Sequence, residues 1–192
     1  MDIIKKSSAG IQSLPLDAML LSQRTIFLTE EITPNSATEL LKQLLFLESE
    51  DTSEPIKLII NSPGGQVSAG LMLYDQLKSM TVPVDLYCVE LAASMAAVIL
   101  AGGTPGHRFI LKHSKVMIHE PFITAGGVGG NASSVQKTAE SILETKRTLV
   151  ELLAQDTGRS VEEIQESLSY DNYMNAEGAV AFGICDGIVD RV

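Results

Sequence analysis

Three residues far apart in the chain could together perform nucleophilic catalysis: Ser94, His119 and Asp171. Ser94 stands within the run AASM (92–95), between a predicted strand and a predicted helix of small residues. A serine at such a turn presents its hydroxyl beside unpaired backbone N–H groups, which can stabilise a developing oxyanion. The simpler interpretation is a core serine that bonds a backbone carbonyl one turn back.

His119 and Asp171 have the residue types that a nucleophilic serine requires. His119 ends the apolar predicted strand 116–118 and precedes a Pro-containing turn, a place where active sites are often built. A histidine base takes the proton of the serine, and a carboxylate orients the histidine. Taken alone, Asp171 reads as a solvent-exposed carboxylate in a loop.

A glycine pair follows the predicted buried strand 56–60 in the run NSPGG (61–65). Glycines there allow unusual backbone angles and close approach of a ligand to the main chain. A free N–H in this turn could form half of an oxyanion hole, although a plain tight turn into a helix is the alternative. The second glycine-rich run, GGVGG (126–130), lacks the Lys-Ser/Thr of a phosphate loop and the Rossmann spacing, so we do not expect nucleotide binding.

Metal and thiol chemistry are weaker alternatives. His107, His113 and His119 are spaced by six residues, but turn residues interrupt the run and no zinc-type motif occurs. Cys88 and Cys185 each lie in an apolar stretch without a Cys–His motif, which favours buried thiols over a catalytic or disulfide role.

The overall composition narrows the classes of partner. The net charge is −10 and the pI is about 4.7, which argues against nucleic-acid phosphates and anionic membrane surfaces. The longest apolar run, 91–101, is too short to span a bilayer, and the N-terminus lacks a signal-peptide core. We therefore expect a single cytoplasmic domain over residues 1–192.

Strands and helices alternate after residue 23, which predicts an α/β fold with mostly parallel strand pairing. The expected strands are 25–28, 56–60, 82–89, 108–111, 115–119 and 184–189, with helices between them. A long helix is expected over about 132–155, with an apolar stripe that belongs to the core or to a subunit interface. Residues 1–23 show no clear period and are interpreted as an arm.

These segments together resemble the ClpP family, the proteolytic subunits of Clp proteases, over nearly the whole chain. The resemblance is carried by an ordered set of motifs: RTIFL (24–28), IINSPGG (59–65), AASM (92–95), VMIHEP (116–121), TG (157–158) and DNYMNA (171–176). It implies a ClpP/crotonase-like spiral of strand-helix units. Residues 1–23 would form an axial arm, and about 123–156 a protruding handle made of a helix and a Gly-rich strand.

The resemblance also implies the roles of the site residues. Ser94 would be the nucleophile, His119 the base and Asp171 the orienter, with the N–H groups of Gly65 and Met95 as oxyanion donors. The implied activity is a serine endopeptidase that needs no cofactor of its own. Two stacked heptameric rings would enclose a chamber, and an ATP-dependent Clp unfoldase would feed unfolded proteins into it.

Several departures from the family pattern support an alternative, a weakly active or silent paralogue that works only in mixed rings. Glu90 and Ala96 stand where members usually have glycine, and the handle segment is longer than is typical. Ser169 and Tyr170 replace an Asp-Arg pair that makes ring-to-ring contacts. A small register shift would also put Asn172, not Asp171, beside His119. A third hypothesis, a crotonase-type acyl-CoA enzyme, shares the fold and the oxyanion hole but would not need all three residues.

Overall fold

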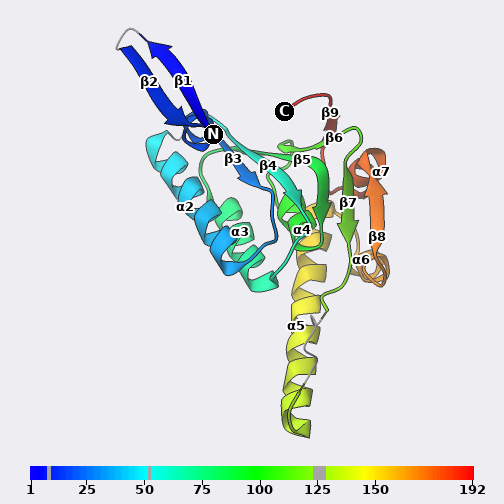
Figure 1. Ribbon diagram of the computed structural model, residues 1–192. Helices are drawn as coiled ribbons and strands as arrows, with labels where there is room; N and C mark the ends of the chain where they lie inside the picture. Colours follow the sequence, from blue (N-terminus) through cyan, green and yellow to red (C-terminus); the bar gives the residue numbers. More distant parts are fainter. Residues whose placement is uncertain (8–9, 52, 123–128) are drawn as a thin grey trace.

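The computed structural model describes residues 1–7, 10–51, 53–122 and 129–192 (Figure 1). Strands and helices alternate along most of the chain, in this order: β1 (Asp2–Ser7), β2 (Gly10–Pro15), α1 (Leu16–Ser22), β3 (Thr25–Leu28), α2 (Pro34–Glu50), β4 (Ile56–Ser62), α3 (Val67–Ser79), β5 (Val84–Ala93), α4 (Met95–Ala101), β6 (Arg108–Leu111), β7 (Lys115–Ile118), α5 (Ala132–Thr157), α6 (Val161–Ser167), β8 (Asn172–Asn175), α7 (Ala176–Phe182) and β9 (Gly187–Val189).

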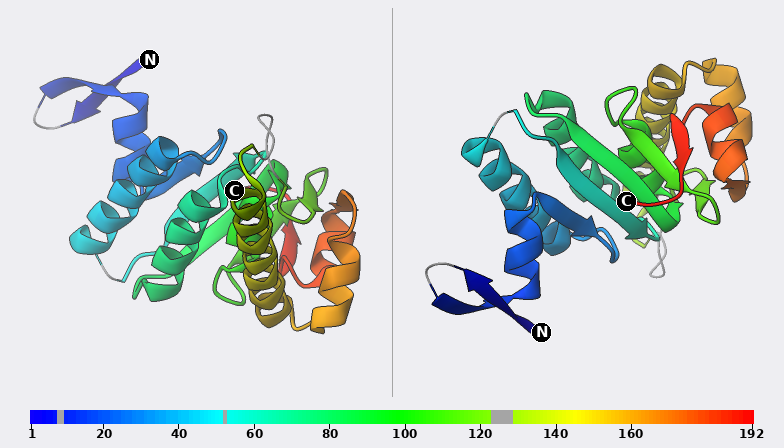
Figure 2. Two further views of the ribbon diagram at one scale, coloured as in Figure 1. Left: turned by 90° about the horizontal axis from the view of Figure 1, so that it is seen from below. Right: turned by 90° about the horizontal axis from the view of Figure 1, so that it is seen from above.

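The expected α/β fold with mostly parallel pairing is confirmed for the described residues. Their main sheet has seven strands, with the path β3-β4-β5-β6-β9, while β7 pairs with both β5 and β8. The pairs along this path and the β5–β7 pair are parallel, whereas β7 and β8 run antiparallel. Figure 2 shows α3 and α5 in front of the strands in one view and behind them in the opposite view, so both helices cover the same face.

Strand β5 changes partner halfway along its length, and this change aims its carboxyl end. Its first half pairs with β6 through Cys88, and its last residues, from Leu91 on, pair with β7. Between these halves the register with β4 shifts, and Glu90 takes a φ of 66°. Such a bulge bends a strand and redirects the residues that follow it. The bend therefore lies shortly before Ser94 in the chain.

Apolar stripes predicted from the sequence form the core. Helix α2 begins at a capping box between Thr33 and Ser36 and buries a stripe with helical spacing. All seven residues of α4 are buried, so this short helix lies inside the protein. Only the C-terminal part of α5 is buried, and the rest of this long helix extends away from the sheet (Figure 1).

The N-terminal arm contains structure that the sequence did not predict. Strands β1 and β2 pair antiparallel, from Asp2 with Pro15 to Ser7 with Gly10, and α1 follows them. This hairpin projects from the body beside α2 (Figure 1). A short hairpin is held by backbone hydrogen bonds, which leave no apolar period in the sequence.

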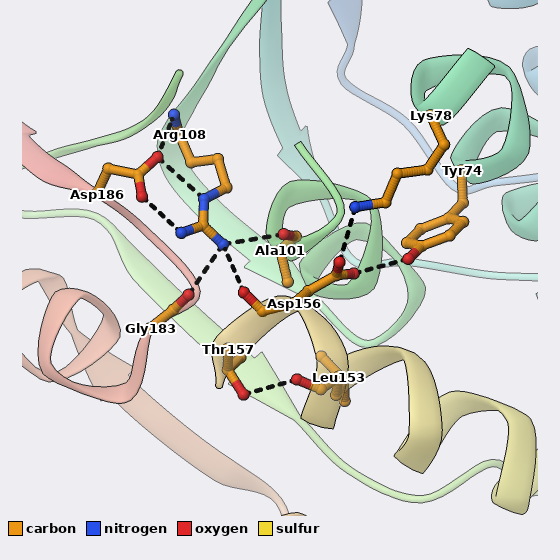
Figure 3. A network of polar contacts seen from close by, with 9 residues as sticks. All are labelled: Tyr74, Lys78, Ala101, Arg108, Leu153, Asp156, Thr157, Gly183 and Asp186. Atoms are coloured by element: carbon orange, nitrogen blue, oxygen red, sulfur yellow. Dashed lines mark hydrogen bonds and ion pairs between the residues drawn. The ribbon is translucent and has the colours of Figure 1, made fainter. Parts of the chain in front are cut away.

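A buried guanidinium joins the C-terminal ends of three helices (Figure 3). The Nη1 atom of Arg108, which is 6% exposed, donates to the carbonyls of Ala101 in α4, Asp156 in α5 and Gly183 after α7, at 3.0, 3.1 and 3.0 Å. A cation there complements the negative ends of the helix dipoles. Its other nitrogens donate to the carboxylate of Asp186.

The carboxylates around this guanidinium are also paired. Burial by itself raises the pKa of Asp186, but the hydrogen bonds and charge of Arg108 outweigh it, so this pKa lies below its ordinary value. The Asp156 carboxylate accepts hydrogen bonds from the Tyr74 hydroxyl at 2.8 Å and from Lys78 Nζ at 2.7 Å. The ends of α4 and α5 are thus fixed relative to α3 and the sheet.

Replacing Arg108 by methionine should therefore destabilise the protein strongly. The change leaves three helix-end carbonyls and a partly buried carboxylate without their donor, which costs about 3 kcal/mol. Denaturant unfolding measures this loss. Arg191→Met, at an exposed position, is the control, and equal stability of the two variants would contradict the role assigned to Arg108.

Candidate active site

Ser94 occupies a strained turn between β5 and α4. Its φ is 53° and its ψ −123°, a region that residues other than glycine rarely adopt. Its N–H donates to the carbonyl of Met117 in β7 at 2.8 Å, so the turn is fixed to the neighbouring strand. A serine on such a strand-to-helix turn presents its hydroxyl outward, as in hydrolases with a nucleophile elbow.

The structure brings Ser94, His119 and Asp171 into one hydrogen-bonded line. His119 Nε2 lies 2.8 Å from Ser94 Oγ, and His119 Nδ1 lies 3.2 Å from Asp171 Oδ1. A carboxylate only accepts hydrogen bonds, so the Nδ1–H tautomer of His119 satisfies both contacts, with Nε2 free to accept from the serine. This is the arrangement that general-base activation of a serine requires.

The pairing of β7 with β8 decides which residue meets His119. Ile118 is the register partner of Asn172 in this antiparallel ladder. One step further along both strands, His119 therefore faces Asp171. Asn172 belongs to β8 itself, so the alternative in which an amide orients the imidazole does not fit this register. Strand β8 was not expected from the sequence, because its four residues NYMN show no strong strand pattern.

The glycine pair packs directly against the Ser94 turn. A Cβ on Gly64 would lie 2.8 Å from the Cβ of Ser94 and 2.9 Å from the backbone nitrogen of Met95. A Cβ on Gly65, whose φ is 151°, would lie 2.3 Å from the carbonyl oxygen of Ile32. Only glycine fits at either position without a shift of the main chain.

Two backbone amides remain available in this turn. The bridge to Ile32 uses the Gly64 carbonyl and the Gln66 N–H, both at 2.8 Å, and leaves the N–H of Gly65 outside it. Met95 is the first residue of α4, where helix N–H groups have no partner within the helix. These are the two amides that the family resemblance implies as oxyanion donors.

Ser62 supports this loop, and the sequence analysis did not single it out. Its buried hydroxyl donates to the Glu30 carbonyl at 2.6 Å and accepts from the Gly64 N–H at 3.1 Å. The signal that could have identified it is a serine at the last position of a buried strand, directly before the glycine turn.

An apolar pocket opens beside Ser94 and His119. Its lining comes from several elements: Val67, Met95, Val98, Ile118, Pro121, Leu149, Leu153 and Leu168. Helix α5 supplies Leu149 and Leu153. The sequence predicted their stripe as core or interface, and a local pattern could not show that it also forms a pocket wall.

The alternative metal and thiol sites receive no support from the described residues. His107 Nδ1 lies 2.6 Å from Asp85 Oδ1, while His119 contacts Ser94 and Asp171. No group of three or more His, Cys, Asp or Glu suited to a metal ion occurs in the part of the chain that the structure describes. Burial raises the pKa of Cys88 to about 12 and also raises that of Cys185, so both thiols stay protonated near neutral pH.

Comparison with protein families shows the family of the chain. The family model described as Clp protease matches residues 8–192. The chain belongs to the Clp protease family. The resemblance drawn from the ordered motifs is thereby confirmed, and the family is one of serine peptidases.

Across the described residues, no helix combines the length and apolarity needed to cross a membrane.

A methyl group at Gly65 tests the predicted oxyanion loop. Because the Cβ of Gly65→Ala would collide with the Ile32 carbonyl, the loop must move and its amide must shift. We expect the rate at which a fluorophosphonate labels the chain to fall by roughly 100-fold, the loss typical of one missing oxyanion donor. The control is Gly187→Ala, whose Cβ would meet only Phe109 at 3.9 Å. Equal labelling rates in the two variants would exclude Gly65 as a donor.

Proposed function

We propose that this chain is a serine endopeptidase subunit in which Ser94 is the nucleophile, His119 the base and Asp171 the orienter. The observation that carries the proposal is the line of hydrogen bonds from Asp171 through His119 to Ser94. The glycine turn packed against Ser94 supports the same function. An acyl-CoA enzyme of the crotonase type would not require these three side chains in one line.

The reaction follows from the positions of these groups. His119 Nε2 accepts the hydroxyl proton while Ser94 Oγ attacks the peptide carbonyl, and the C–O bond forms as the carbonyl becomes an oxyanion. The amides of Gly65 and Met95 would stabilise that oxyanion. The imidazolium, stabilised by Asp171, then protonates the leaving amine as the C–N bond breaks. Water, activated in the same way, hydrolyses the acyl-enzyme and releases Ser94.

The apolar pocket would receive the substrate side chain that precedes the cleaved bond. Its walls are aliphatic, and its polar groups are those of Ser94 and His119. Such a pocket favours apolar residues over charged ones, because a charge would lose its hydration without gaining a partner. Pairing of an extended substrate through its main chain would leave the rest of the sequence weakly specified.

The proposed assembly is two heptameric rings that enclose a chamber, fed with unfolded protein by an ATP-dependent Clp unfoldase. The chain itself would need no cofactor, since the unfoldase consumes the ATP. The whole of 1–192 would form one peptidase unit, with residues 1–23 as the axial arm. The long helix α5 suits a handle over about 123–156, because it extends from the body and exposes Leu143 (Figure 1). Its expected Gly-rich strand falls partly on 123–128, outside the described residues.

A second candidate is a subunit that becomes active only in mixed rings. Asp171 is 66% exposed in the single chain, and Tyr170 beside it is 60% exposed. Water competes strongly with an exposed carboxylate for hydrogen bonds. A neighbouring ring that covered this segment would strengthen the contact between Asp171 and His119. Light scattering after size-exclusion chromatography separates the two candidates, because a fully active homo-tetradecamer excludes the second.

Fluorophosphonate labelling tests the proposed nucleophile. We expect intact mass to show one adduct on the wild-type chain and none on Ser94→Ala, with the fold retained. Asp171→Asn should keep the fold and slow labelling by roughly 100-fold or more, because an amide does not stabilise the imidazolium. An adduct on Ser94→Ala would disprove the assignment of the nucleophile.

Filling the pocket should change which peptides are cleaved. Val67→Phe narrows the pocket, so kcat/KM for peptides with a large apolar residue before the cleaved bond should fall by roughly tenfold relative to alanine peptides. The exposed Val161→Phe is the control. If the ratio of the two kcat/KM values stays unchanged in Val67→Phe, the pocket does not receive this side chain.

A further inference from the structure

We infer that Glu120 and Lys146 form a positioning pair that holds the His119 imidazole in line for the reaction. The inference rests on the proposed peptidase function and adds residues that the triad does not include. Glu120 directly follows His119, and its carboxylate forms an ion pair with Nζ of Lys146 in α5.

The imidazole needs support beyond its orienting carboxylate. The Asp171 side chain is 66% exposed, and its oxygen lies 3.2 Å from His119 Nδ1, the long end of the usual range. The Phe122 ring contacts His119 edge-on, with ring centroids 5.2 Å apart, but this ring is 67% exposed. These two contacts alone leave the ring weakly held from the solvent side.

Glu120 ties the histidine segment to two other elements. Its backbone N–H donates to the carbonyl of Leu168 at 2.9 Å. Leu168 is the C-cap residue of α6 and begins the short segment that leads to Asp171. The Glu120 side chain contacts α5 through its ion pair with Lys146. One residue therefore joins the segments that carry His119 and Asp171 to the helix that forms the pocket wall.

Lys146 lies where α5 passes from its exposed half to its buried half. Residues 132–141 are exposed, whereas Leu149 and Leu153, one and two turns after Lys146, are buried and line the pocket. The pair therefore links the residue after His119 to the part of α5 that is fixed in the core.

Loss of the Glu120–Lys146 ion pair should lower the reaction rate far more than it lowers the free energy of unfolding. The Lys146 and Glu120 side chains are 34% and 46% exposed, and ion pairs of that exposure contribute little to folding. Small displacements of a catalytic group, by contrast, cost large factors in rate. A purely structural ion pair would show no selective loss of kcat, and therefore no coupling in kcat between the two residues.

The test compares Lys146→Met, Lys146→Arg, Glu120→Gln and the double variant Glu120→Gln/Lys146→Met in the full-length chain. The measurements are kcat and KM on an apolar peptide, the fluorophosphonate labelling rate and thermal unfolding. We expect Lys146→Met to lower kcat and labelling by roughly tenfold, with KM and the unfolding temperature nearly unchanged. Lys146→Arg should keep the wild-type rate, and the double variant should be no slower than Lys146→Met.

Lys42→Met is the matched control, because it breaks the exposed Glu39–Lys42 ion pair of α2, away from the site. The inference is overturned if Lys146→Met reacts at the rate of Lys42→Met, or if the losses of the two single variants multiply in the double variant. In either case a labelled wild type leaves the proposed function intact. A wild type that neither reacts with fluorophosphonate nor cleaves peptides would overturn the proposed function and this inference together.

Discussion

Strand β7 is the element on which the arrangement of the site depends. Its parallel pairing with β5 fixes the Ser94 turn, since the Ser94 N–H donates to the Met117 carbonyl. Its antiparallel pairing with β8 brings Asp171 opposite the residue that follows the strand, which is His119. Ser94, His119 and Asp171 thus lie at the ends of three adjacent strands, and the central strand holds the other two in register. Pairing of this kind positions side chains more accurately than loops do.

Local backbone strain near Ser94 is balanced by rigid surroundings. Ser94 and Glu90 both have positive φ angles, and neither is a glycine. Such conformations cost about 1–3 kcal/mol each and persist only where the neighbouring structure enforces them. Here α4 is fully buried, and its far end is held by Arg108 together with the ends of α5 and α7. The Glu90 side chain also accepts a hydrogen bond from Asn61, near the end of β4, at 2.7 Å.

In the single chain, one side of the site is buried and the other side is exposed to solvent. The pocket side is lined by buried residues of α4 and α5, whereas Asp171, Phe122 and Tyr173 are largely exposed. Because the Asp171 carboxylate that contacts His119 is exposed, the alignment of His119 is sensitive to whatever covers or supports that side. The proposed neighbouring ring and the Glu120–Lys146 pair would both stabilise the alignment of His119, the ring from outside the chain and the ion pair from within it.

The sequence by itself determined the family, the parallel α/β fold and the residue types of the site. These follow from local signals: apolar strands that end in glycine turns, capped helices, and short motifs in a fixed order. It left open whether Asp171 or Asn172 meets His119, because a shift of one residue changes no local pattern. It did not indicate the β1–β2 hairpin, strand β8, the role of Ser62 or the Glu120–Lys146 pair. Those features depend on which distant segments lie side by side, and only the tertiary pairing of β7 and the packing of α5 decided that.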